Sequence, residues 1–113
     1  MIKTIKYTEA EPRKNPHGID ARALYDQKDA MASHLLLKPG EHLKKHITPV
    51  DVFFYMLEGK GVVEVGDEKK EVDKDTLIES PKDIPHNWHN ESDEILRILV
   101  VKTPKPTKGT KVL

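Results

Sequence analysis

The sequence contains no cysteine among its 113 residues. Disulfide bonds, thiolate zinc sites and cysteine nucleophiles are therefore excluded. It also lacks a net charge, because 19 Lys and Arg residues balance 19 Asp and Glu residues. Charge thus gives no argument for nucleic acid or an anionic membrane as a partner. No apolar run approaches the ~20 residues that a membrane helix needs, and the N-terminus has no apolar signal segment. We therefore expect a soluble, cytoplasmic protein with no membrane partner.

Uninterrupted segments of helix length are scarce as well, because proline or glycine recurs throughout the chain. The segments between these breaks have strand character, and Gly66 and Asp67 mark the turn of a predicted hairpin. The candidate strands cover residues 18–26, 30–40, 50–59, 61–72, 75–81 and 94–104. Many short strands at this spacing predict an all-β sandwich or barrel.

The length suits a single domain, residues 1–113. Within it, residues 1–30 form an N-terminal strand region that begins with a loop. Residues 103–113 form a tail rich in proline and lysine, without hydrophobic periodicity. We expect this tail to be mobile or to lie over the surface.

Six histidines are the main candidates for chemistry. His17 lies in a predicted loop and is interpreted as an exposed bystander. His34 lies within an apolar strand and is interpreted as a hydrogen-bonded histidine of the core or of an interface. Neither is expected to contribute to a functional site.

The other histidines begin two polar strand faces. His42 and His46 share a strand parity with Thr48, so a regular strand points all three side chains to one face. His86 shares its parity with Trp88 and Asn90, and His89 points the other way. Two such faces, about forty residues apart in sequence, can converge inside a barrel.

Two motifs in the sequence resemble those of the cupins. The first, G-x5-H-x-H-x3,4-E-x6-G, matches the segment from Gly40 to Gly59, with His46 at the first histidine position. The second, G-x5-P-x-G-x2-H-x3-N, matches at Pro81, His86 and Asn90, and its glycine positions hold Asp75 and Asp83. Aspartate tolerates the left-handed conformation that such turns need. The resemblance implies a double-stranded β-helix, a jelly-roll barrel of two antiparallel sheets.

The resemblance also implies a metal site with fewer ligands than usual. Metal-binding cupins of this kind use three histidines and a glutamate, and only His46 and His86 carry over. The remaining positions hold Thr48 and Val52. Asp51 would replace the glutamate only at an irregular corner, since a shift of one residue turns a strand side chain to the opposite face. Two imidazoles can hold a divalent metal such as Zn, Ni, Fe, Mn or Cu.

Apolar residues beside the two histidines predict a pocket with a polar patch. Its expected lining is Thr48, Val52, Phe54, Met56, Trp88, Asn90 and, at the mouth of the barrel, His42. In the alternative interpretation, the apolar residues of this set fill the core.

Different functions remain open at this point. The first is a barrel that binds a divalent metal, a small molecule or both in its interior, as a metal-dependent oxygenase or isomerase. The alternative is a metal-free module that binds a small metabolite or sugar without catalysis. A third is an interaction protein defined by its dimer interface, and acid–base catalysis by the histidines without metal ranks below these. Apolar residues on both faces of segments 33–37 and 95–101 predict a homodimer.

Overall fold

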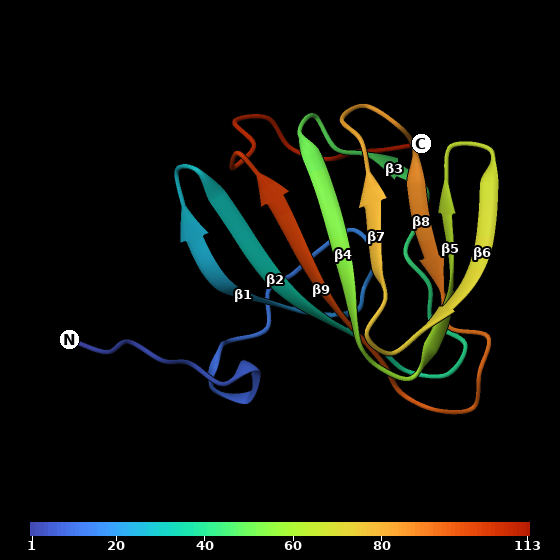
Figure 1. Ribbon diagram of the computed structural model, residues 1–113, viewed down its shortest axis with the longest axis horizontal. Helices are drawn as coiled ribbons and strands as arrows, with labels where there is room; N and C mark the ends of the chain where they lie inside the picture. Colours follow the sequence, from blue (N-terminus) through green and yellow to red (C-terminus); the bar gives the residue numbers. More distant parts are fainter.

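Short antiparallel strands occupy most of the segments between the proline and glycine breaks (Figure 1). The computed structural model describes residues 1–113. One sheet has the strand order β1 (Asp20–Gln27), β2 (Ala30–Leu37), β9 (Leu96–Thr103), β4 (Asp51–Glu58) and β7 (Leu77–Ser80). The other has the order β10 (Lys111–Val112), β3 (His46–Ile47), β8 (His86–His89), β5 (Lys60–Val65) and β6 (Glu68–Asp73). The only helical element is a single 3-10 turn, η1 (Tyr7–Glu9), and no helix is long and apolar enough to span a membrane.

The core lies between the two sheets, where alternate residues of each strand point inward. In β4 the buried positions alternate strictly with more exposed ones, and β9 shows the same period from Leu96 to Val100. Thirteen buried apolar residues form one cluster, with Leu37, Met56, Trp88, Leu96 and Ile98 fully enclosed. Two facing antiparallel sheets around one core confirm the predicted all-β jelly-roll barrel.

The turns agree with the motif analysis. Asp75 and Asp83, which stand where the motif has glycine, have φ angles of 66° and 64°. They are the only residues other than glycine with positive φ, so both aspartates adopt the left-handed conformation expected of them. The hairpin between β5 and β6 turns at Gly66 and Asp67, as predicted.

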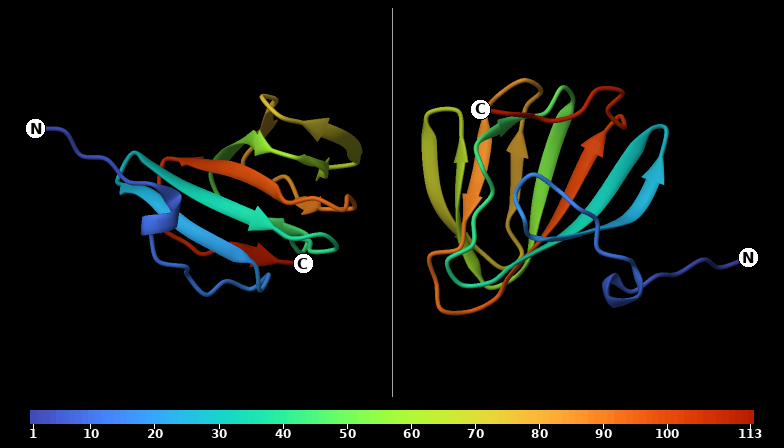
Figure 2. Two further views of the ribbon diagram at one scale, coloured as in Figure 1. Left: turned by 90° about the horizontal axis from the view of Figure 1, so that it is seen from below. Right: turned by 180° about the vertical axis from the view of Figure 1, so that it is seen from behind.

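The two ends of the chain close the barrel on one side. The segment that precedes β1 crosses the barrel as a loop (Figure 2), held by a hydrogen bond from the Arg13 amide to the Ala21 carbonyl. The C-terminal tail lies over the surface and adds the short strand β10, in which Val112 pairs with His46 of β3. The sequence did not predict this strand, because two residues carry no periodicity.

Candidate functional site

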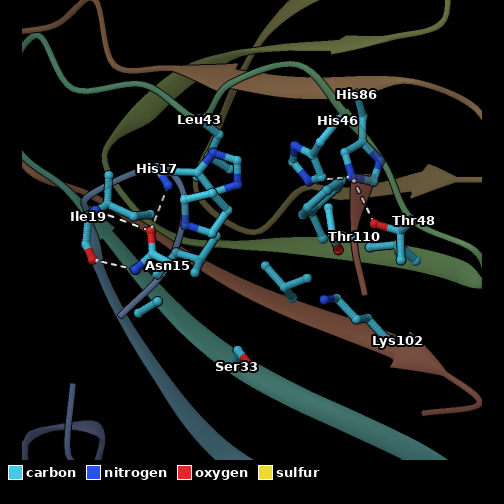
Figure 3. A pocket seen from close by; sticks show the side chains of 16 residues that line it. Asn15, His17, Ile19, Ser33, Leu43, His46, Thr48, His86, Lys102 and Thr110 are labelled. Atoms are coloured by element: carbon cyan, nitrogen blue, oxygen red, sulfur yellow. Dashed lines mark hydrogen bonds between the residues drawn. The ribbon is translucent and has the colours of Figure 1, made fainter. Parts of the chain in front are cut away.

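A cavity of about 180 Å³ lies between the sheets, beside β3 and β8 (Figure 3). Both sheets, the N-terminal loop and the C-terminal tail contribute to its lining of sixteen residues. The polar members are Asn15, His17, Ser33, His46, Thr48, His86, Lys102 and Thr110. Aspartate and glutamate are absent from the lining. The cavity is therefore the place where side chains able to bind a ligand or take part in catalysis come together.

His46 and His86 form the polar centre of this cavity. They are cross-strand partners in β3 and β8, and both are buried, with exposed fractions of 8% and 2%. Their Nε2 atoms lie 2.9 Å apart, and the two rings meet edge to face. Two residues forty positions apart are thus brought into direct contact by the pairing of their strands.

The hydrogen bonds of this pair determine where its protons lie. Burial lowers the pKa of both imidazoles, to about 3 for His86, so the rings are neutral at pH 7. Because a carbonyl oxygen only accepts, the Nδ1–H of His46 donates to the Lys44 carbonyl at 2.6 Å. Its Nε2 then accepts from the Nε2–H of His86, and the Nδ1 of His86 accepts from the hydroxyl of Ser80 at 2.6 Å. Each ring therefore has a defined tautomer.

Lys102 brings a positive charge into the cavity. It continues the inward parity of β9 and is the cross-strand neighbour of Val52 in β4. Its ammonium makes no ion pair in the structure, and burial alone lowers its pKa. Lys102 was not among the residues predicted from the sequence, although its strand parity with Leu96, Ile98 and Val100 was a usable signal.

His17 also belongs to the cavity, which overturns its interpretation as an exposed bystander. Its Nδ1 accepts a hydrogen bond of 2.9 Å from the Lys44 amide, and its ring centre lies 4.8 Å from that of His46. Burial, followed by the repulsion that a protonated His46 would exert, lowers its pKa to about 4. The Asn15 side chain shapes the loop by bonding the backbone of His17 and Ile19. Only the folded loop brings these residues to the cavity, because no periodic pattern marks them.

Only some of the residues expected in the pocket line the cavity. Thr48, Val52 and Phe54 line the cavity. Met56 and Trp88 do not, although both are completely buried. The Phe54 ring meets those of His86 and Trp88 edge to face, at centroid distances of 5.3 and 5.4 Å. Phe54 is thus the floor of the cavity, and Met56 and Trp88 belong to the core behind it.

His42 and Asn90 also lie outside the cavity lining. His42 is exposed and stacks on His89, with ring centres 5.5 Å apart. The segment between His42 and β3 is not a regular strand, so the parity shared with His46 is lost and Leu43 points inward instead. The Asn90 side chain is buried and donates to the carbonyls of Leu37 and Glu94. It holds a turn together.

The donor set does not fit a tightly bound divalent metal. Only His46 and His86 present suitable nitrogens, and these are hydrogen-bonded to each other. His17 accepts through Nδ1, so its other nitrogen carries the proton. Asp51 is exposed and accepts from the Lys82 amide, away from the cavity. No group of three or more His, Asp or Glu side chains is arranged for a metal, and the charge of Lys102 opposes a second cation.

Acid is expected to destabilise the fold through its buried histidines. Burial, followed by Arg97, lowers the pKa of His34 to about 4, and this ring stacks on Tyr7 and accepts from Arg97 Nε. The unfolded chain binds more protons below pH 6.5, so stability falls from there toward the lowered pKa. His34 then contributes a loss of up to about 2 kcal/mol between pH 7 and 5.

Urea unfolding at both pH values measures this loss in the free energy of unfolding. Between pH 7 and pH 5, the variant His34→Gln, which keeps an acceptor for Arg97, should lose less free energy of unfolding than the wild type does. His42→Gln, an exchange at an exposed position, is the control. An unchanged pH dependence in His34→Gln would show that His34 is not the source.

The comparisons with known proteins agree with this architecture. The family model described as "Cupin domain" matches residues 33–102. TT1209 from Thermus thermophilus is 30% identical, with a TM-score of 0.78, and the match covers 92% of this chain and all of that one. The polyketide cyclase RemF from Streptomyces resistomycificus is 20% identical, with a TM-score of 0.85, covering 100% and 86%. A comparison with curated proteins gives no significant match. With both motifs, the barrel and the family match in agreement, the chain belongs to the cupin family.

Proposed function

We propose that this cupin binds a small molecule in its barrel cavity and does so without a metal. The observation that carries the proposal is a partly open cavity whose lining combines hydrogen-bonding groups with apolar side chains. Such a combination is typical of ligand sites, because apolar walls provide affinity and a few polar groups set orientation.

The size of the cavity restricts the ligand. A volume of about 180 Å³ slightly exceeds that of an engineered apolar cavity of about 150 Å³ that binds benzene. The ligand is therefore a small metabolite, or the part of a larger one that enters the barrel. A complete oligosaccharide does not fit this space.

The test combines elemental analysis with thermal shift. The protein, purified without a histidine tag, is expected to contain no stoichiometric metal and to gain little melting temperature from Zn²⁺, Ni²⁺ or Mn²⁺. A panel of small metabolites should contain compounds that raise the melting temperature by mass action. Stoichiometric metal would instead favour the metal-dependent oxygenase or isomerase, and a panel without any stabilising compound would contradict the proposal.

We also propose the homodimer that the sequence predicted. It is supported by the outward face of β4 and β9, where Phe53 pairs with Val101 and Tyr55 with Leu99, all only partly covered. A dimer that packs these faces together would remove apolar surface from water. Light scattering that finds a monomer at micromolar concentration would contradict it.

A further inference from the structure

The cavity contains an unbalanced positive charge. Burial lowers the pKa of its three histidines, so Lys102 is the one lining residue that carries a charge at neutral pH. No carboxylate lines the cavity, and none contributes to the pKa shift of Lys102. The Lys102 side chain is partly covered, and an unpaired charge that loses part of its hydration costs a fold stability. Its presence here needs an explanation beyond folding.

The geometry points this charge at the space where a ligand would lie. Lys102 extends from β9 into the cavity, across from His46 and His86 (Figure 3). Its ammonium has no hydrogen-bond or ion-pair partner in the protein. The lysine ion pairs of the chain, made by Lys45, Lys60 and Lys105, lie on the surface. The donors of Lys102 are therefore free for a bound molecule.

Most of the other polar groups in the lining can donate as well. The hydroxyls of Ser33 and Thr110 have no partner in the protein, and Thr48 has only a long contact of 3.5 Å with His86. His17 accepts through Nδ1, so its neutral ring carries a proton on Nε2. The Nε2 of His46, the strongest acceptor in the lining, is not free, because it accepts from His86. This lining matches a ligand that accepts hydrogen bonds.

The remaining wall is apolar. Leu35, Val52, Phe54 and Val100 form it, and all four side chains are buried. A small ion alone would leave this wall without contact. The cavity is therefore complementary to a molecule with an anionic end and an apolar body about the size of a benzene ring.

We propose that the ligand of this cavity is a small organic carboxylate with an apolar body, whose carboxylate pairs with the ammonium of Lys102. The inference rests on the proposed function and adds the chemical class of the ligand. An ion pair in a site of low polarity is stronger than the same pair in water, and it is further supported by hydroxyl donors. The unpaired lysine is thus a binding residue whose partner arrives with the ligand.

The test uses pairs of probes that differ in charge and hardly in shape. Benzoate is compared with benzamide, and isovalerate with isovaleramide, by calorimetry and thermal shift at pH 7.5. The wild-type protein should bind at least one carboxylate at least tenfold more tightly than its amide. Lys102→Met should lose this preference and still bind the amide as the wild type does. Lys74→Met, at an exposed position in the turn before β7, should behave as the wild type.

The unliganded variant supplies a second readout. Lys102→Met should melt above the wild type, because methionine replaces an unpaired charge with an apolar chain of similar length. A lower melting temperature would show that the ammonium stabilises the fold, and would overturn the proposal. Amides that bind as tightly as the acids would overturn it too, and so would an unchanged preference in Lys102→Met. If these probes fail and the metabolite panel yields only neutral ligands, the inference is wrong and the proposed function stands. If nothing binds, both are wrong.

Discussion

The double variant Val52→Glu/Lys102→Met is expected to bind Zn²⁺ at least ~100-fold more tightly than the wild-type protein. Val52 lies in β4 between Ser80 of β7 and Lys102 of β9, its cross-strand partners. Directly opposite residues share a face of the sheet, so a carboxylate at position 52 enters the cavity that contains His46 and His86. It supplies the third, anionic ligand, and the second substitution removes the competing cation.

The single variant Val52→Glu separates the effect of the added carboxylate from the effect of removing the lysine charge. Its carboxylate is opposite Lys102 and should form an ion pair with it, which leaves less negative charge for a metal. Zinc affinity should therefore rise less than in the double variant. In the presence of a chelator, the double variant should lose a few kcal/mol of stability, roughly the cost of burying an unpaired carboxylate, and it should regain this on adding Zn²⁺.

Calorimetric unfolding with and without Zn²⁺ measures both the stability of each variant and its zinc affinity. Val52→Gln/Lys102→Met is the matched control, because it has the same shape without the charge. Metal binding also requires His86 to carry its proton on Nδ1 and not on Nε2. The Ser80 hydroxyl can then rotate and accept a hydrogen bond from that Nδ1–H. If the double variant is destabilised and gains no affinity over the glutamine control, residue 52 does not face the two histidines.

Replacing Gly59 with alanine is expected to destabilise the protein by about 3 kcal/mol or more. Gly59 has a φ of 78°, and a Cβ atom on it would lie 2.3 Å from the backbone carbonyl oxygen of Ile95. A backbone atom cannot move aside as a flexible side chain can, so the turn before β5 must shift. Native domains are stable by only about 5–15 kcal/mol, so this loss is a large part of the total.

Gly40→Ala is the matched control for this effect. Gly40 has a similar φ of 84°, but nothing lies within 4 Å of a Cβ atom placed on it. The control therefore suffers only the left-handed strain of about 1–2 kcal/mol. Urea unfolding should give a midpoint for Gly59→Ala well below that of Gly40→Ala. Equal midpoints would show that the close approach to Ile95 relaxes without cost.

The strands, and the turns that the motifs specify, could be predicted because their signals are local. Inward and outward residues alternate along β4 and β9 with the period that the pleat requires. Asp75 and Asp83 occupy positions where the motif needs a left-handed residue, and both adopt this conformation. The cavity lining was predictable only in part. Thr48, Val52 and Phe54 follow their strand parity, but Phe54 closes the cavity before it reaches Met56 and Trp88.

The sequence by itself determined that this chain forms a cupin barrel and that His46 and His86 come together in it. Both expectations came from the two motifs that resemble those of the cupins, in which the spacing of turn and strand residues sets which side chains share a face. Only the tertiary structure decided what surrounds the two histidines. His17 and Thr110 reach the cavity from irregular segments without a period, and His42 leaves it where strand parity breaks before β3. The pairing of β4 with β9 places Lys102 beside Val52, because such neighbours are set by contacts between strands far apart in sequence.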